Sequence, residues 1–465
     1  MAPRDKVVPL VVACPLFLQN LDTSAIATAL PAIARSLNVQ TLHLNLAITS
    51  YLLSLAVFLP VSGWAAGRFG ARRVFCIAIA CFSLGSALCG LANSLPTLVA
   101  FRVLQGFGGA MMVPVARLIL LRSVQPAAMV AAMVWFTVPP TVGRMIGSLF
   151  GGAIVTWTSW RWIFLLTVPF GLLGIALAMR FIPDQNDETV REPFDVIDFL
   201  LLAVGLTGLL GALEMTGKGL VEPSVVAAAA AVGALAMAGY VRRSRRTATP
   251  MVNLGVMKFR TYYASIVGGT PLRIAIGASP FLLPLLFQLG FGLSPLDSGL
   301  LTVATALGSL ATRAVMSRAI HRFGFRTLLL GATAMAGVIY MTYGLFDPGT
   351  PHFLMFIAML FGGLMTSMAM VALQTLAFSE IPKPLMSHAT TLSTMTQQVS
   401  LTFGVVLGAS LVGATSWWHG GDATHLTARD FSPAFFFIGL MTLLSLFFHS
   451  RLGPDEGAAM RRQDP

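Results

Sequence analysis

Long apolar runs separated by short polar loops follow one another along the whole chain. A helix needs about 20 mostly apolar residues to cross the hydrocarbon core of a bilayer, and the runs are of that order. Because lipid offers no hydrogen-bond partners to the backbone, we expect these runs to form helices rather than open strands. The expected spans lie near 7–31, 43–66, 74–93, 96–121, 127–156, 162–181, 198–216, 223–241, 261–289, 297–319, 327–346, 352–378, 389–415 and 432–450.

The composition supports a membrane protein. Of the 465 residues, 56% are hydrophobic and 10% are charged, whereas about a quarter of the residues in a soluble domain are charged. The formal net charge of +12 could indicate a nucleic-acid partner, but the basic residues stand in short loops and form no continuous stripe. We therefore expect a surrounding lipid bilayer and no nucleic acid.

Lysine and arginine are distributed unevenly between the two sets of loops. With a cytoplasmic N-terminus, the inner loops hold about 22 of the 30 Lys and Arg, and the outer loops hold about 4. The positive-inside rule then predicts a multi-pass protein of the inner (plasma) membrane with both termini cytoplasmic. The first span is expected to be retained, because no signal-peptide cleavage site follows it.

A basic turn between two spans occurs twice. The first copy runs from Gly63 to Arg73, and the second is Arg322-Phe323-Gly324-Phe325-Arg326. The copies stand about 254 residues apart, which at roughly 30 residues per helix and loop holds eight helices rather than six. The sequence therefore predicts an all-α integral membrane fold of 14 helices in a 6 + 2 + 6 order. Two pseudo-symmetric six-helix bundles (1–183, and 247–465 with a short cytoplasmic tail) flank two inserted helices with linkers (184–246).

Ionisable side chains inside the spans are candidates for function, because burying a charge in a membrane is costly unless it is paired or hydrated. Asp22 stands in the first span, and Arg102 stands in the fourth at a similar depth. Burial favours a neutral carboxyl group, whereas a nearby guanidinium favours the carboxylate. A change in their separation could therefore bind and release a proton, which makes this pair the candidate for proton coupling. The alternative is a static ion pair between helices.

Further polar side chains within spans are candidates for a substrate cavity. They flank Asp22, lie one turn after Arg102, or interrupt the fifth, ninth and thirteenth spans: Gln19, Asn20, Gln105, Arg144, Arg273, Gln397 and Gln398. For Arg273 the alternative is pairing with backbone carbonyls that neighbouring prolines free. Histidines show no metal spacing, and no phosphate-binding loop or nucleophile triad occurs. We expect no enzyme and no cofactor, with a proton gradient rather than ATP as the energy source.

The fifth span carries small residues along one face, namely Gly143, Gly147, Gly151 and Gly152. Such a face lets another helix approach closely. Because Pro139 and Pro140 precede it, we expect a bendable helix at the interface of two moving halves. Simple close packing is the alternative.

The chain resembles the major facilitator superfamily, specifically its drug:proton antiporters with fourteen spans. The resemblance is carried by Leu21-Asp22-Thr23 through Ala29-Leu30-Pro31, the Gly63 to Arg73 turn, Arg102 to Ala110 with Met111-Met112-Val113-Pro114, and Trp160-Arg161-Trp162-Ile163-Phe164. It implies the major facilitator fold, alternating access, and export of amphipathic organic compounds or drugs in exchange for protons. It also implies that the 143–152 face is the antiporter helix face and that Arg102 supports coupling. The gating turn would latch the cytoplasmic side through Gly63, Gly67, Arg68, Gly70, Arg72 and Arg73.

Three positions depart from the family pattern. The family usually has an acidic residue at the position of Gly67, a Gly-Pro pair where Gly147-Ser148 stands, and often a proline in place of Arg144. These departures keep two alternatives open: a non-transporting receptor or scaffold that retains the fold, and an exporter of one specific metabolite. An integral-membrane enzyme is disfavoured, because no loop is rich in His, Asp or Glu. In each case we expect a monomer.

Overall fold

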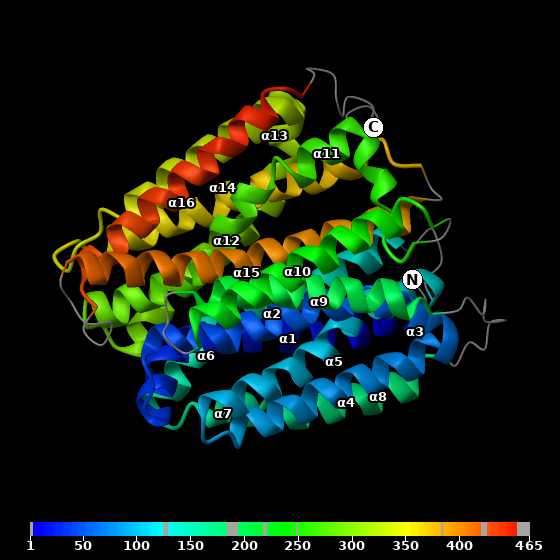
Figure 1. Ribbon diagram of the computed structural model, residues 1–465, viewed down its shortest axis with the longest axis horizontal. Helices are drawn as coiled ribbons and strands as arrows, with labels where there is room; N and C mark the ends of the chain where they lie inside the picture. The colour runs from blue at the N-terminus through cyan, green and yellow to red at the C-terminus, as the bar shows by residue number, and fades with distance from the viewer. Residues whose placement is uncertain are drawn as a thin grey trace.

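The computed structural model describes residues 3–123, 129–183, 194–216, 221–247, 250–382, 385–419 and 426–452, and within these ranges the secondary structure is helical. Long helices lie side by side, and the start of α1 and the end of α16 point toward the same end of the molecule (Figure 1). The first half contains α1 (Pro3–Leu37), η1 (Thr41–Leu44), α2 (Asn45–Phe58), α3 (Val61–Phe69), α4 (Ala71–Gly90), α5 (Leu95–Ser123), α6 (Met129–Trp157), α7 (Arg161–Leu165) and α8 (Thr167–Phe181).

Two inserted helices follow, α9 (Val196–Met215) and α10 (Pro223–Ser244). The second half contains η3 (Leu254–Lys258), α11 (Arg260–Ile266), α12 (Thr270–Leu285), η4 (Leu286–Gly290), α13 (Pro295–Tyr343), α14 (His352–Phe378), α15 (Met386–Trp418) and α16 (Ala428–His449).

The expected spans have counterparts in these helices. Thirteen segments of the described chain are long and apolar enough to cross a bilayer. The 29-residue α6 occupies the remaining expected span near 127–156. The 6 + 2 + 6 arrangement of 14 helices predicted from the sequence is therefore confirmed.

Helix breaks were predicted less well than helix positions. The expected span 43–66 is α2 followed by α3, with Leu59 and Pro60 between them. The span near 261–289 is interrupted at 267–269, between α11 and α12. Conversely, α13 runs through two expected spans, and its one residue outside helical geometry is Gly324, with φ 75°. Gly70 has the corresponding conformation, with φ 87°. Each basic turn therefore contains one glycine with a positive φ, a conformation that other residues avoid.

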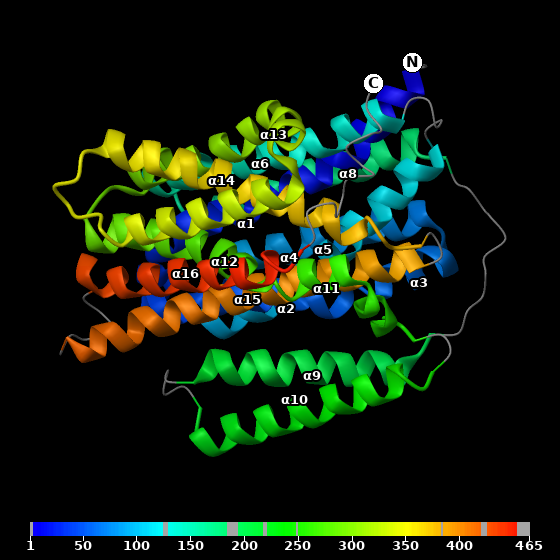
Figure 2. The ribbon, with the colours of Figure 1, turned by 90° about the horizontal axis from the view of Figure 1, so that it is seen from above.

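The two halves meet along two seams. One seam is formed by α6 and α13, and the other by α2 and α15. The inserted hairpin α9–α10 lies outside the bundle against the second seam (Figure 2). There, Leu202 and Leu206 of α9 share an apolar cluster with Val57 of α2 and Met395 of α15. The hairpin therefore touches both halves.

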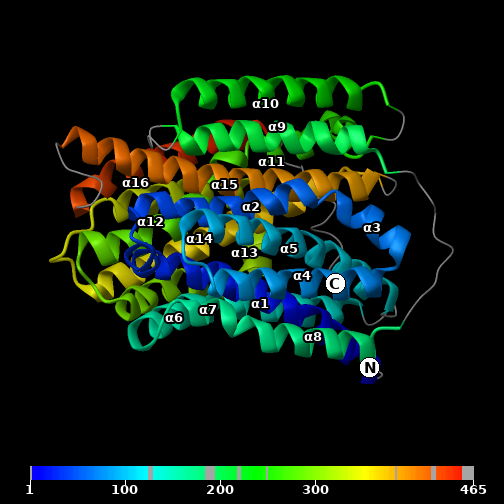
Figure 3. The same ribbon diagram turned by 60° about the horizontal axis from the view of Figure 1, so that its bottom comes forward.

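Helix α10 is the outermost helix of the hairpin (Figure 3). Its large apolar side chains are exposed, with Leu235 73% and Val232 54% accessible. Exposed apolar surface along a helix of this length fits contact with lipid acyl chains. The hairpin is therefore held by α9 and presents α10 to the membrane.

Candidate functional site

The central feature of the first half is an ion pair between α1 and α5. Nη1 of Arg102 lies 2.7 Å from Oδ2 of Asp22, and both side chains are 0% exposed. A pair at this distance is a charge-assisted hydrogen bond, shielded from water on every side. The structure thus brings together the two candidates for proton coupling.

Arg102 also contacts two further helices. Its Nε donates to the carbonyl of Ala47 in α2 at 2.9 Å, and its Nη1 donates to Oε1 of Gln105 at 2.6 Å. The guanidinium carbon lies 4.4 Å from the ring centroid of Tyr51 and 5.8 Å from that of Phe164. The aromatic faces stabilise the cation where water cannot reach it. Arg102 therefore joins α1, α2, α5 and α7 at one point.

Several polar atoms around this pair have no hydrogen-bond partner within the described chain. They are Oδ1 of Asp22, Nη2 of Arg102, Nε2 of Gln105, Oε1 of Gln19 and the hydroxyl of Tyr51. Buried polar atoms are normally satisfied, so unmatched ones point to capacity for a bound proton, water or ligand. Tyr51 was missed by the sequence analysis. A hydroxyl-bearing ring in an apolar span, in a chain with 6 Tyr, was the available signal.

Glycines of α6 hold α1 close to that helix. A methyl group added at Gly143, Gly147 or Gly151 would lie 2.4, 2.6 or 2.5 Å from the carbonyl oxygens of Phe17, Leu21 and Ala25, respectively. Both rows repeat every four residues, so the two helices pack glycine against backbone over two turns. Leu21 directly precedes Asp22, and the glycine row therefore sets the position of the carboxylate.

A second set of α6 residues, Thr141, Ser148 and Gly152, contacts the second half. A Cβ added at Gly152 would lie 2.4 Å from the carbonyl oxygen of Pro295, and one added at Gly299 would lie 2.6 Å from that of Ser148. Nη2 of Arg313 donates to Oγ1 of Thr141 at 2.9 Å. The predicted glycine face is thus divided: Gly143, Gly147 and Gly151 pack within the first half, whereas Gly152 lies at the seam.

Arg144 lies beside the set of α6 residues that contacts the second half. Its side chain is exposed although it stands midway along α6, and its backbone carbonyl accepts a hydrogen bond from Oγ of Ser24 at 2.9 Å. The cation is therefore accessible and separate from the buried pair.

Arg273 lies away from the Asp22 pair, inside the second half. It is 1% exposed, and Nη1 donates to the carbonyls of Ser265 and Ile266 at 3.0 and 3.1 Å. These carbonyls are freed by the break between α11 and α12 rather than by Pro280 or Pro284. Arg273 therefore compensates a helix break.

The remaining candidates for the cavity are distributed over two helices. Gln19 is 7% exposed, and Nδ2 of Asn20 donates to the carbonyl of Leu16 one turn earlier. Gln397 and Gln398 are half-buried on α15, which is one of the two helices of the other seam. Only Gln19 and Gln105 belong with the Asp22 pair.

Each basic turn is attached to the last helix of its own half. Nη1 of Arg72 donates to the carbonyl of Ile182, just after α8, at 3.3 Å. In the second turn, Nη2 of Arg326 donates to the carbonyl of Ser450, just after α16, at 2.8 Å. Arg68 and Arg73 are exposed, and added methyl groups at Gly63 and Gly67 would meet nothing within 4 Å.

Sequence comparison identifies the family. The family model described as Major Facilitator Superfamily matches twice, over residues 12–269 and 265–465. The chain belongs to the major facilitator superfamily. This membership makes it a membrane transporter rather than an enzyme.

Curated superfamily relatives are similar over almost their whole length. "Putative multidrug resistance protein MdtD" of Salmonella heidelberg (strain SL476) is 34% identical over 448 residues, 96% of this chain and 94% of the relative. The protein of that name from Pectobacterium atrosepticum is 35% identical over 445 residues, 96% of this chain and 95% of the relative.

Solved superfamily structures share the fold. A D-xylose-proton symporter aligns with TM-score 0.68 at 16% identity, covering 97% of this chain and 98% of its own. An auto-inhibited POT family peptide transporter aligns with TM-score 0.69 at 15% identity, covering 99% and 97%. At these identities the likeness concerns architecture alone.

Proposed function

We propose that this transporter exports amphipathic organic compounds in exchange for protons, by alternating access of its two halves. In this proposal it works as a monomer in the inner (plasma) membrane, with both termini cytoplasmic. The relatives named for multidrug resistance support the substrate class. The observation that carries proton coupling is the fully buried pair of Asp22 and Arg102.

Coupling follows from the charge balance of that pair. When a proton binds the Asp22 carboxylate, the group becomes neutral and loses its charge attraction for Arg102. Arg102 then keeps the carbonyl of Ala47 and the amide of Gln105 as partners. Because four helices meet at this arginine, a change in its bonding biases how they pack, which is what a conformational switch requires. Loss of the proton restores the ion pair.

The test is uptake into lipid vesicles reconstituted with the purified protein. Under an imposed pH gradient, the wild-type protein should accumulate a fluorescent organic cation, and Asp22→Asn should abolish accumulation. Asp347→Asn is the matched control, because Asp347 is an exposed turn residue whose carboxylate accepts a hydrogen bond from the backbone amide of Gly349. Accumulation that does not depend on the pH gradient, or that persists in Asp22→Asn, would contradict proton coupling.

A specific organic anion is the second candidate substrate. The observation that favours it is Arg144, an accessible cation beside the seam between the halves. Arg144→Gln should then reduce uptake of anionic amphiphiles while uptake of cationic ones stays unchanged or rises. An equal change in the uptake of anionic and cationic amphiphiles would indicate that Arg144 has only a structural role. Ligand binding without accumulation of any compound class would instead favour the receptor alternative.

A further inference from the structure

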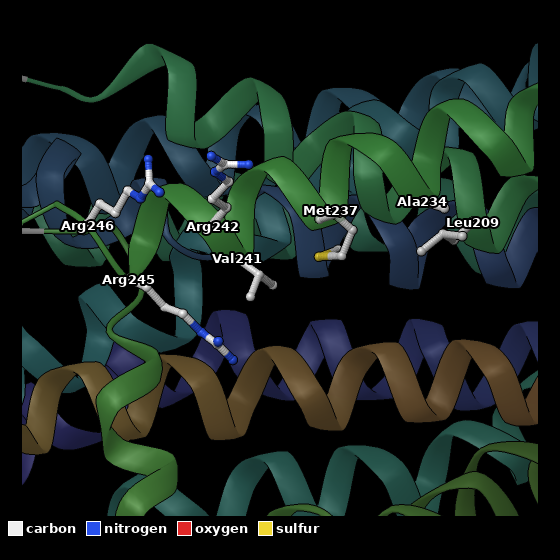
Figure 4. Close-up of a pocket in the computed structure, with 8 residues that line it drawn as sticks. Leu209, Ala234, Met237, Val241, Arg242, Arg245 and Arg246 are labelled. Carbon is white, nitrogen blue, oxygen red and sulfur yellow. The ribbon is translucent and has the colours of Figure 1, made fainter.

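A groove runs along the inserted hairpin, outside the Asp22 site. It has a volume of about 620 Å³ and is lined by one residue of α9, Leu209, and by residues of the second half of α10 and the two positions after it: Ala234, Met237, Ala238, Val241, Arg242, Arg245 and Arg246. Figure 4 shows Met237 and Val241 along one side of α10 and three arginines near its end, with Arg245 on the side of Val241 and with Arg242 and Arg246 on the other side. The groove is thus apolar for most of its length and cationic at one end.

The residues of the groove form two adjacent rows. Ala234, Ala238, Arg242 and Arg246 repeat every four positions, and so do Met237, Val241 and Arg245. Side chains four residues apart lie above one another on a helix, so each row begins with small or apolar groups and ends in a guanidinium. A ligand lying between the rows would meet hydrocarbon first and positive charge last.

The three arginines are not used by the fold. Each is exposed, and within the described chain none of their guanidinium groups has a hydrogen-bond or ion-pair partner. The neighbouring Arg243 is different, since it binds Asp195 at 2.9 Å and Asp198 at 2.8 Å and so fastens the two helices. Cations at the C-terminal end of a helix also interact favourably with the helix dipole, and cations are common in cytoplasmic loops. Neither of these two general effects explains why both rows of one groove end in arginine.

We infer that the groove binds an anionic phospholipid. An acyl chain lies along Leu209, Met237 and Val241, and the phosphate is held by Arg242, Arg245 and Arg246. The location supports this occupant, because α10 is the outermost helix of the hairpin (Figure 3) and its apolar side chains Val232 and Leu235 are exposed. Basic pockets between membrane helices on the cytoplasmic side suit anionic headgroups. A zwitterionic lipid offers the same chains but no net charge to match three cations.

Native mass spectrometry of the detergent-purified protein tests the inference. Dioleoyl phosphatidylglycerol should form a one-lipid adduct at concentrations where dioleoyl phosphatidylcholine does not. Arg242→Gln/Arg245→Gln/Arg246→Gln should weaken that adduct by on the order of a hundredfold, since each basic residue near a lipid surface contributes roughly a factor of five. The matched control is Arg180→Gln/Lys258→Gln/Arg318→Gln, which removes three exposed cations outside the groove.

A second variant keeps the charge and fills the apolar part. Ala238→Phe should also weaken the phosphatidylglycerol adduct, whereas inorganic phosphate added in excess should not displace the lipid. Equal adducts in the groove triple variant and the control triple variant would overturn the inference. Displacement by inorganic phosphate, or an unchanged adduct in Ala238→Phe, would overturn it as well, because the acyl chain would then make no contribution. The assay requires no transport, so its outcome is separate from that of the proposed function.

Discussion

Arg72 and Arg326 occupy equivalent positions, two residues after the left-handed Gly70 and Gly324, and each donates to a carbonyl just beyond the last helix of its own half. The two turns are therefore related by contact as well as by sequence. In each half, the start of the third helix is bound to the end of the sixth. The basic turn thus fastens each half internally at this end.

Removing either arginine should loosen the half to which it belongs. Arg72→Gln and Arg326→Gln each lose a hydrogen bond from a charged donor, worth about 1.5–3 kcal/mol when protected from water and less at these partly exposed sites. We expect each variant to lower the thermal midpoint of the detergent-solubilised protein by a few degrees. Lys258→Gln, an exposed cation in η3, is the control. Midpoints equal to that of the control would show that the contacts contribute no stability.

The Asp22–Arg102 pair should behave as a unit. Asp22→Asn leaves a buried arginine without its counter-ion, and Arg102→Gln leaves a buried carboxylate, each at a cost of about 3–5 kcal/mol. The double variant removes both charges and should unfold closer to the wild-type protein than either single variant. Denaturant unfolding measures this coupling energy. Additive losses in the double variant would contradict it, and gradient-driven transport should be absent from all three variants.

Gly147→Ala should displace α1 from α6. The added methyl group would lie 2.6 Å from the carbonyl of Leu21 and 2.8 Å from Cβ of Ser24, so the helices must separate. Overpacking of this kind costs about 1–3 kcal/mol, and here it also moves the residue next to Asp22. We expect lower thermal stability and reduced proton-driven uptake. Gly211→Ala is the control, because nothing lies within 4 Å of its added Cβ; equal stability of the two variants would contradict the packing argument.

Gly67→Asp tests the departure from the family pattern in the gating turn. The added Cβ would meet nothing within 4 Å, and Gly67 lies within α3, so the side chain fits without strain. Replacing a helical glycine should stabilise α3 slightly, and the new carboxylate adds a negative charge to a turn that carries Arg68, Arg72 and Arg73. If the turn acts as an inner latch, initial rates of uptake should change while protein stability rises only slightly. Gly67→Asn separates charge from size, and identical rates for both variants would exclude a role for the charge.

The base of the hairpin should respond to acid. The backbone amide of Asp198 and the guanidinium of Arg243 both bind the Asp195 carboxylate and hold its pKa below its ordinary value, although partial burial opposes them. A lowered folded-state pKa means that the stabilisation is present above the ordinary aspartate pKa of about 3.9 and is lost as pH falls through the lowered value. Asp195→Asn should therefore increase amide hydrogen exchange at the start of α9 at pH 7, and the difference from the wild-type protein should shrink near pH 3. A difference independent of pH would contradict the charge effect.

The sequence predicted the helices well because apolar length alone decides which segments cross a bilayer. It also nominated Asp22 and Arg102, because a charged residue within a long apolar run is conspicuous from hydropathy alone. It did not predict the break at 267–269 or the bonding of Arg273 to the carbonyls exposed there, since glycine and proline, as in Gly268-Gly269-Thr270-Pro271, also occur within unbroken membrane helices. Nor could it divide the glycines of α6 between α1 and the seam. That division depends on the direction in which each face points, which only tertiary packing determines.

The hairpin of α9 and α10 covers one seam only. It rests on α2 and α15, whereas the seam between α6 and α13 lies on the other side of the bundle (Figure 2). A twofold repeat would make the two lateral faces of the transporter equivalent, and the insertion removes that equivalence. In the proposed alternating-access cycle, movement of one half against the other shears the contacts of the hairpin on its own side, and the described part of the chain places no such element on the opposite side. The surrounding membrane therefore meets a protein with two unlike flanks, although its halves are built alike.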